Sequence, residues 1–241
     1  MESEIRPGRF QVLPVVIKNL IIINALVWLA QITVGKDLLS IEDLFALHHF
    51  SSVHYHFWQF ITYMFLHSSD SFFHILFNML FLYWFGLLVH QYLGSRKLTN
   101  LYILGGLFGA AFYLLIYNLA PYFSGSVDNS LMLGASAGVY AVVGGAATLA
   151  PQTTFVLLLL GPVKIVYIAA FYVILSFANS IGANAGGEIA HLGGALLGYL
   201  YITQLRKGRD LGIPVQKVGI FFEDLFSRKS NVKRYSKRSK I

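Results

Sequence analysis

Long uncharged apolar runs alternate with short polar segments along this chain. About 20 apolar residues cross a bilayer as a helix, and the pattern predicts six transmembrane helices joined by polar connections. The predicted helices are Val15–Val34, Phe72–Tyr92, Leu98–Leu119, Leu131–Ala150, Val163–Phe177 and Ile189–Leu205. Pro151 ends the fourth, because proline cannot continue a helix. The expected fold class is therefore an all-α polytopic membrane protein.

The first connection, from Lys36 to Ser71, is long and contains two apolar pieces of its own. Ile41–Phe50 has an amphipathic pattern, and Phe57–Leu66 is rich in aromatic residues. Such segments favour the membrane–water interface, where one face is apolar and the other is wet. We therefore expect a six-transmembrane-helix bundle with a long interfacial first loop.

The composition agrees with a membrane protein and excludes thiol chemistry. Only 12% of the 241 residues are charged, whereas soluble domains carry about 25% charged residues. The mean hydropathy is +0.62. The chain has no cysteine, so it has no disulfide, no thiol nucleophile and no thiolate metal ligand.

The basic residues fall on one side of the predicted membrane. With six spans both termini share that side, and an excess of Lys and Arg marks it as cytoplasmic. The basic residues there are Arg6, Arg9, Lys18, Arg96, Lys97, Lys164 and those from Arg206 onward. The opposite side carries Lys36, Asp37, Glu42, Asp43, Asp70, Asp128 and Glu188. We expect a cytoplasmic N-terminus (1–13), a six-helix domain (14–205) and a basic cytoplasmic tail (206–241).

Four polar side chains are expected to share one layer of the membrane. The second, fourth and sixth helices enter from the outer side, and polar residues lie early in each: His74, Asn78, Ser136 and His191. Ser136 is about five residues into its run, roughly 7 Å along a helix. Polar groups inside a membrane are costly and usually functional. A serine alone favours a bond to the carbonyl four residues earlier, but four polar groups together favour catalysis.

Small residues accompany both Ser136 and His191. They are Gly134, Gly138, Gly194 and Gly198. Glycines at four-residue spacing let helix backbones approach closely, so the fourth and sixth helices can meet at Ser136 and His191. We interpret this pair as a catalytic Ser–His dyad, a nucleophile with its general base.

Three further residues can support the dyad or border it. His74 and Asn78 are spaced i, i+4 on one face, and both can donate hydrogen bonds to a developing oxyanion. Tyr140, four residues after Ser136, could orient the imidazole by stacking. Glu188 precedes His191 by three residues, and its loop position favours a solvated charge at the helix entry, so no third catalytic member is expected.

In these motifs the chain resembles the rhomboid intramembrane serine proteases, from about Val15 to Leu205. The matching motifs are Gly134-Ala135-Ser136-Ala137-Gly138 with Tyr140, His74-Ile75-Leu76-Phe77-Asn78, and Ala190-His191-Leu192-Gly193-Gly194 with Gly198. Phe65-Leu66-His67 and Gly86 with Gly94-Ser95-Arg96 also resemble family positions. Gln59 and His90 depart from the family, which often has an arginine and an acid there; both positions concern packing rather than catalysis.

The resemblance implies a role for each site residue. Ser136 would be the nucleophile and His191 the base, with Gly134 and Tyr140 in support. His74, Asn78 and the backbone N–H of Ser136 would form the oxyanion hole, and Tyr140 would stack on His191. The implied activity is cleavage of single-pass membrane proteins near small, helix-destabilising residues, with no metal or cofactor.

Several other functions were weighed against this one. A catalytically silent rhomboid-like protein that binds membrane clients would lack the dyad, which this chain keeps. A small transporter would need paired intramembrane charges or broken helices. The G-x-S-x-G elbow of soluble α/β-hydrolases needs a strand before it in a soluble sheet, which the spans disfavour. The H-E-x-x-H motif of zinc proteases and paired intramembrane aspartates are both absent.

The histidines of the first loop favour an ordinary surface loop over a metal site. They are His48, His49, His54 and His56. No acids accompany them at the regular spacing expected of residues that orient metal ligands.

The C-terminal tail carries a separate pattern. Apolar residues recur at helical spacing and basic residues follow: Val218, Phe221, Phe222, Leu225 and Phe226, then Arg228, Lys229, Lys233, Arg234, Lys237, Arg238 and Lys240. This predicts an interfacial helix with a polybasic segment on an anionic leaflet, although a disordered solubilising tail fits equally well.

The expected partners are single-pass transmembrane substrates and membrane lipids. Nucleic acid is excluded, because no fold for it accompanies the charge. The short N-terminus does not have the Arg- and Ser-rich, acid-poor composition of a transit peptide, which favours a bacterial inner membrane.

Overall fold

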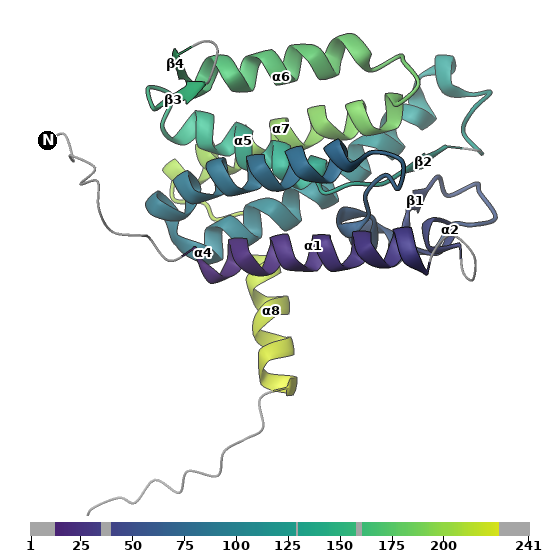
Figure 1. Ribbon diagram of the computed structural model, residues 1–241, viewed down its shortest axis with the longest axis horizontal. Coiled ribbons are helices and arrows are strands. Elements are labelled where there is room, and N and C mark those ends of the chain that lie inside the picture. Colours follow the sequence, from purple (N-terminus) through teal and green to yellow (C-terminus); the bar gives the residue numbers. More distant parts are fainter. Residues whose placement is uncertain (1–12, 35–39, 129, 158–160, 227–241) are drawn as a thin grey trace, which may run out of the picture.

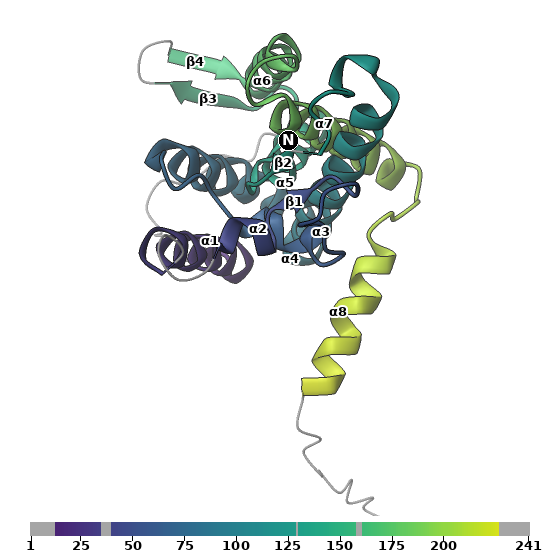
Figure 2. The same ribbon diagram turned by 90° about the vertical axis from the view of Figure 1, so that its right-hand side faces the viewer.

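The computed structural model describes residues 13–34, 40–128, 130–157 and 161–226. Its main helices lie side by side in one bundle (Figures 1 and 2). They are α1 (Val15–Thr33), α4 (Phe72–Leu119), α5 (Ser136–Leu149), α6 (Ile165–Asn179) and α7 (Ala185–Arg206). The helices α4, α5 and α7 pack most extensively on one another and form the centre, with α1 against α4 and α6 against α7 and α5.

The helix α4 combines the second and third predicted spans. Its 48 residues are interrupted at Gly94, which has a φ of 77°. This left-handed conformation suits glycine, because other residues meet a Cβ clash there. His90 lies just before the break, and its Nε2 is 3.1 Å from the Ser95 hydroxyl oxygen. His90, which departs from the pattern of the resembled family, therefore makes a local polar contact across the turn.

Two of the described helices, α1 and α4, are long and apolar enough to cross a membrane. The helices α5 and α6 have only 14 and 15 residues, so they fall short of the length of about 20 residues that spans a bilayer unaided. The structure confirms that the protein is mostly helical. The number of six spans stays a prediction.

Short elements gather at the two ends of the bundle (Figure 1). At one end are α2 (Ile41–Phe45), β1 (Leu47–His48), α3 (Gln59–Thr62), η1 (Tyr63–Phe65), η2 (Pro121–Phe123) and β2 (Leu131–Met132). There β1 and β2 pair antiparallel, with Leu47 opposite Met132. Apart from β2, which lies at the start of the fourth predicted span, these segments are among those expected on the outer side of the membrane.

The opposite end carries a β-hairpin where the sequence predicted only a connection between the fourth and fifth helices. The strands β3 (Thr154–Leu157) and β4 (Gly161–Lys164) pair antiparallel. Side chains alternate between exposed and half-buried along both strands, which is the period of two that a strand requires. Phe155 packs on Phe85 of α4, with ring centroids 5.1 Å apart, and this contact anchors the hairpin. Residues 158–160 lie outside the described residues.

Three predicted helix boundaries near the site are wrong. Away from it, β4 takes Val163 and Lys164, so the fifth helix begins at Ile165 rather than Val163. The fourth helix was expected from Leu131, but α5 begins at Ser136, because β2 and Gly134 occupy the intervening residues. The helix α6 extends to Asn179 and α7 begins at Ala185. The loop expected at 178–188 is therefore only five residues long, and Glu188 belongs to a helix.

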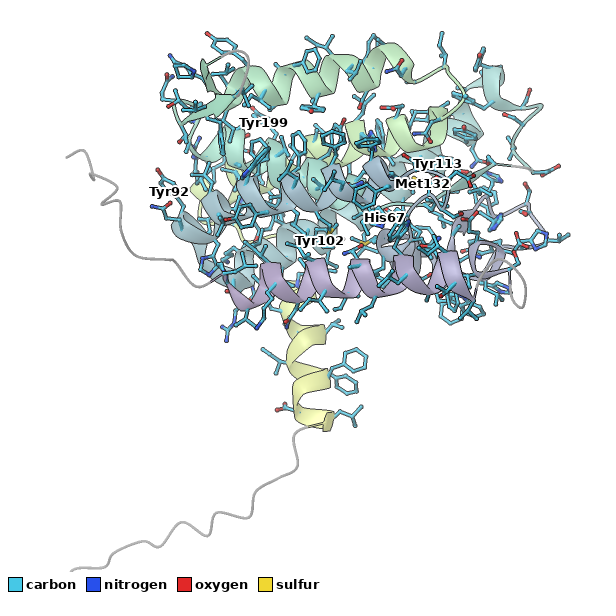
Figure 3. The ribbon with its side chains drawn as sticks, in the orientation of Figure 1. His67, Tyr92, Tyr102, Tyr113, Met132 and Tyr199 are labelled. Atoms are coloured by element: carbon cyan, nitrogen blue, oxygen red, sulfur yellow. The ribbon has the colours of Figure 1, made fainter. Side chains whose placement is uncertain are left out.

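The glycines bring α5 and α7 together, which confirms the predicted close approach. A Cβ on Gly194 would lie 2.1 Å from the carbonyl oxygen of Ala137, and one on Gly198 would lie 2.3 Å from that of Ala141. Any side chain there would collide with backbone. Large aromatic side chains fill the rest of the interior, where Tyr102 and Tyr113 are fully buried (Figure 3).

Gln59 organises the first loop from inside. Its side chain is fully buried, and its Oε1 accepts backbone N–H groups from His48 and His56 at 3.3 and 3.1 Å. Its Nε2 donates to the carbonyl oxygens of His54 and Asp43 at 2.8 and 3.1 Å. A neutral amide can both donate and accept, so Gln59 satisfies both backbone N–H groups and carbonyl oxygens of this loop. An arginine only donates and could not do both.

The last described helix, α8 (Ile213–Phe226), leaves the bundle at a steep angle (Figures 1 and 2). The segment before it is tied down by Asp210, which forms an ion pair with Lys97 of α4 and accepts the N–H of Gly212 at 2.9 Å. The predicted tail helix is thus confirmed over its described part. The basic residues from 227 onward lie outside the described residues.

Candidate active site

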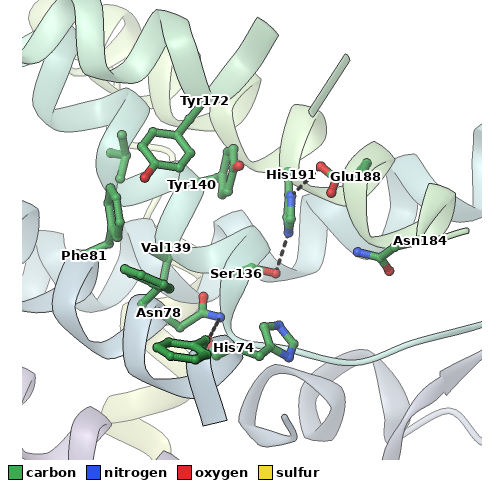
Figure 4. A pocket seen from close by; sticks show the side chains of 13 residues that line it. His74, Asn78, Phe81, Ser136, Val139, Tyr140, Tyr172, Asn184, Glu188 and His191 are labelled. Atoms are coloured by element: carbon green, nitrogen blue, oxygen red, sulfur yellow. Dashed lines mark hydrogen bonds and ion pairs between the residues drawn. The ribbon is translucent and has the colours of Figure 1, made fainter. Parts of the chain in front are cut away.

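A cavity of about 400 Å³ opens between α4, α5, α6 and α7 (Figure 4). Aromatic side chains of α4, α5 and α6 form much of its wall. Its polar lining residues are His74, Asn78, Ser136, Tyr140, Tyr172, Asn184, Glu188 and His191. The structure therefore brings all four predicted polar residues, from three separate helices, to one cavity.

Ser136 and His191 meet across the contact between α5 and α7. The Nε2 of His191 lies 2.7 Å from the Oγ of Ser136, within the range in which a base can take a hydroxyl proton. The ring of Tyr140 stacks on the imidazole, with centroids 4.2 Å apart and planes inclined by 9°. The imidazole is thus held on its face by Tyr140 and at its edge by Ser136.

Ser136 is the first residue of α5 rather than a residue in its interior. The first N–H groups of a helix have no intrahelical partner, and the helix dipole adds positive potential at this end. Gly134, with a φ of 135°, turns the chain into this position. The hydroxyl of Ser136 therefore stands beside backbone donors that can stabilise negative charge.

His74 presents a nitrogen donor toward Ser136. The backbone N–H of Ser68 donates to its Nδ1 at 3.1 Å, so the ring proton of a neutral His74 is on Nε2. A Cβ on Gly134 would lie 3.1 Å from that Nε2 and 3.3 Å from the Oγ of Ser136. The absence of a side chain at Gly134 therefore leaves the space between His74 and Ser136 open for a reacting group.

Asn78 lies one turn further along α4. It is 7% exposed, and its Nδ2 donates to the carbonyl oxygen of His74 at 2.8 Å. An amide nitrogen has two hydrogens, so a second donor faces the cavity that Asn78 lines. The carbonyl contact also fixes the rotamer of the side chain.

Two residues around His191 were not identified as site residues from the sequence. Glu188 was expected to be a solvated charge, but its side chain is only 17% exposed and its Oε2 lies 3.1 Å from the Nδ1 of His191. Ser176 of α6 is fully buried; its Oγ is 3.2 Å from the same Nδ1 and donates to the Tyr140 hydroxyl at 3.0 Å. The i, i+3 spacing of Glu188 and His191 was the signal that could have revealed the first.

The other histidines form no metal centre in the described part of the chain, where no three His, Cys, Asp or Glu side chains could share an ion. His48 and His54 face each other with ring centroids 5.4 Å apart, and His56 stacks on Trp58. Burial, with a smaller contribution from His54, lowers the pKa of His48. Burial, assisted by His74, lowers the pKa of His67 to about 3. With a pKa this low, the buried ring of His67 is neutral at pH 7.

A second cavity, of about 540 Å³, adjoins the first. It is lined by the first half of α4, the β3–β4 hairpin and α6, and it shares Phe77, Phe81 and Tyr172 with the first cavity. Its other lining residues are also mostly apolar. Phe81 of α4 and Tyr172 of α6 touch edge to face, with centroids 4.8 Å apart, at the boundary that the two cavities share.

Comparisons with known proteins place the lining residues of this cavity within a matched domain. A family model described as the Rhomboid domain matches residues 54–208, which include all the polar residues of the first cavity. RHOMBOID-like protein 12, mitochondrial, of Arabidopsis thaliana is 29% identical over 205 residues. The match covers 80% of this chain and 59% of that protein, so this chain spans about three-fifths of the length of its relative.

Proposed function

Because the chain belongs to the rhomboid family, whose members are integral membrane proteins, we propose that it is an intramembrane serine endopeptidase. The observation that carries this proposal is the 2.7 Å contact between the Oγ of Ser136 and the Nε2 of His191. A serine next to an imidazole in a cavity with oxyanion donors has the parts that acyl transfer needs.

The proposed reaction proceeds in two balanced steps. In the first, Oγ of Ser136 bonds to the substrate carbonyl carbon while its proton passes to Nε2 of His191. The peptide C–N bond then breaks, and His191 gives that proton to the leaving amine. In the second, water adds to the acyl carbon and gives a proton to His191, which returns it to Oγ as the ester bond breaks. No metal or cofactor takes part in these steps.

The negative charge of each tetrahedral intermediate needs donors already in place. His74 Nε2 and Ser136 border the open space beside Gly134, and Asn78, with one N–H not used by the His74 carbonyl, lines the same cavity. Preorganised donors in a site with little water are the largest single contribution in many enzymes of this class. We assign the oxyanion hole to these three groups.

We propose that the substrate is a single-pass transmembrane segment that reaches Ser136 through the second cavity. That cavity is mostly apolar and lies between α4 and α6, and it shares Phe77, Phe81 and Tyr172 with the first cavity. A membrane helix could exchange lipid contacts for contacts with these aromatic walls with little change in free energy. Displacing Tyr172 from Phe81 would open the way.

The compartment expected from the sequence has no support in the comparisons. A bacterial inner membrane was expected, whereas the name of the Arabidopsis relative places that protein in the mitochondrion. We therefore propose only the sidedness, with six spans and both termini on the side that carries the basic residues. Anionic lipid on that side is the proposed partner of α8 and the basic tail.

A fluorophosphonate probe tests the proposal, because it labels a serine only when a base activates it. The detergent-solubilised protein is treated beside Ser136→Ala and His191→Ala, with Ser126→Ala as a control serine outside the cavity. Labelling of the wild type and the control, with none in the other two, is the expected result. Labelling that survives Ser136→Ala would identify a different nucleophile.

The same experiment separates the enzyme from a silent family member. A folded wild type that takes no label and cleaves no transmembrane substrate in proteoliposomes would favour a protein that binds membrane clients without cutting them. Folding is checked independently by thermal unfolding in the same detergent, so a misfolded preparation is not mistaken for a silent one.

A further inference from the structure

We infer that Glu188 is a positioning residue that extends the Ser136–His191 pair to a Ser–His–Glu triad. This inference rests on the proposed function, because it assigns a role in the same reaction. It departs from the two-residue arrangement that the sequence predicts. The carboxylate of Glu188 contacts the imidazole of His191, and it acts through that ring.

Both nitrogens of His191 are engaged, and on opposite edges of the ring (Figure 4). Nε2 faces Ser136 at 2.7 Å, and Nδ1 faces the Oε2 of Glu188 at 3.1 Å. To accept the serine proton, Nε2 must be unprotonated, so Nδ1 must carry the ring hydrogen. A carboxylate can only accept. Glu188 therefore selects the tautomer that the base needs.

The carboxylate is also placed to stabilise the imidazolium that forms during the reaction. The side chains of His191 and Glu188 are 13% and 17% exposed, so water screens their interaction far less than it would at the surface. When His191 takes the proton of Ser136, its positive charge develops next to a fixed negative one. The aspartate of soluble serine proteases acts in this way.

Ser176 is the other acceptor near Nδ1, at 3.2 Å, and its position explains why Glu188 is the better orienter. Ser176 belongs to α6, which borders the apolar cavity through which a substrate is proposed to enter. Glu188 and His191 are three residues apart on one helix, α7. A shift of α6 would break the contact with Ser176 and leave the contact with Glu188 in place.

A purely structural role does not account for this orientation. An acid in the first turn of a helix is stabilised by the helix dipole wherever its side chain points. The side chain of Glu188 instead turns toward the ring of His191 (Figure 4), at hydrogen-bonding distance from Nδ1. The titratable residues that line the cavity are His74 of α4, Tyr140 of α5, Tyr172 of α6, and Glu188 and His191 of α7, so Glu188 is the acid available to His191.

The experiment compares Glu188→Gln, Glu188→Asp and Glu42→Gln with the wild type in proteoliposomes that contain a transmembrane substrate. We expect Glu188→Gln to lower kcat by about 10- to 100-fold with KM unchanged. This is less than the ~10⁴-fold loss in soluble triads, because Tyr140 and Ser176 still hold the ring. Glu42→Gln is the matched control: it neutralises a glutamate that bonds Ser69, away from the cavity.

The pH profile of kcat/KM distinguishes positioning from structural support. A carboxylate beside an imidazole favours its protonated form, so removing the charge should move the acid limb to lower pH by about one unit. Glu188→Asp keeps the charge and should retain the wild-type limb with most of the kcat. Thermal unfolding in detergent shows whether each variant is folded.

The outcomes are distinguishable from a failure of the proposed function. An active wild type with full kcat in Glu188→Gln would overturn the triad and leave the protease intact. A reduced kcat with an unmoved acid limb would also overturn it, since that is the result of a structural role. A wild type without labelling or cleavage would overturn the proposed function first. If Glu188→Gln does not fold, an Asp variant with a displaced limb would count against the inference.

Discussion

Gly134 shows how one residue without a side chain shapes the site. Its φ of 135° is a conformation that residues with a Cβ rarely adopt. It also leaves open the space between His74 and Ser136, where the oxyanion would form. Backbone conformation and access to the nucleophile therefore depend on the same glycine.

Replacing Gly134 with alanine should slow fluorophosphonate labelling of Ser136 by at least about tenfold. The added methyl would stand 3.1 Å from His74 and 3.3 Å from Ser136, and the backbone strain at positive φ costs of the order of 1–3 kcal/mol. The rate of labelling is measured against Gly125→Ala, whose added Cβ meets no heavy atom within 4 Å. Equal rates in the two variants would show that the open space is not required.

At the scale of single elements, the helix starts and the exposed faces matter most. The start of α5 at Ser136 places the nucleophile at the positive end of a helix, and the early start of α7 brings Glu188 onto the same helix as His191. The helix α8 exposes one apolar face. Val218, Phe221, Phe222 and Leu225 are each at least half exposed, although they follow one helical face.

A spin label on Leu225→Cys should report burial in lipid when the full-length protein is placed in nanodiscs containing anionic lipid. The chain has no native cysteine, so a single label is specific. Apolar side chains on α8 would enter the interface while the basic tail binds the headgroups. Gly219→Cys, on another face of α8, serves as the control. Equal accessibility to a water-soluble relaxant at both positions would contradict a membrane-bound α8.

At the scale of the whole molecule, a polar junction ties the bundle to its C-terminal segment. Asp210 pairs with Lys97, next to the break in α4, and also accepts hydrogen bonds from Gln216 at 3.1 Å and Tyr201 at 3.3 Å. Burial by itself would raise the pKa of Asp210, but the hydrogen bonds from Lys97 and the Gly212 N–H outweigh it. The pKa of Asp210 is therefore lowered.

This lowered pKa predicts a pH-dependent contribution to stability. A carboxyl with a depressed folded-state pKa contributes its full stabilisation above the ordinary value of about 3.9 and loses it as pH falls through the folded value. Asp210→Asn should cost about 1 kcal/mol near pH 7, and the difference should fade below about pH 4. Thermal unfolding in detergent, with Asp70→Asn as the exposed control, measures it. A difference that is constant down to pH 3 would refute the assignment.

The sequence by itself determined the apolar segments and the residues that carry the chemistry. Hydropathy is a local property, so the helices α1, α4 and α6 could be predicted from it. The motifs around His74, Ser136 and His191 place polar residues in helices where burial of a polar group costs free energy. This identifies them as candidate functional residues before their contacts are known. The glycine spacing also predicted that α5 and α7 would meet, because only glycine allows that approach.

Only the tertiary structure decided where α5 begins, how the hairpin forms and where Glu188 points. The residues Leu131–Ala150 are apolar throughout, so nothing local separates the strand β2 from the helix; the pairing of β2 with β1, more than 80 residues earlier, does. Glu188 could face water or His191 with the same sequence. In the fold its side chain is 17% exposed and lies 3.1 Å from the Nδ1 of His191, because α7 begins early enough to carry both residues on one helix.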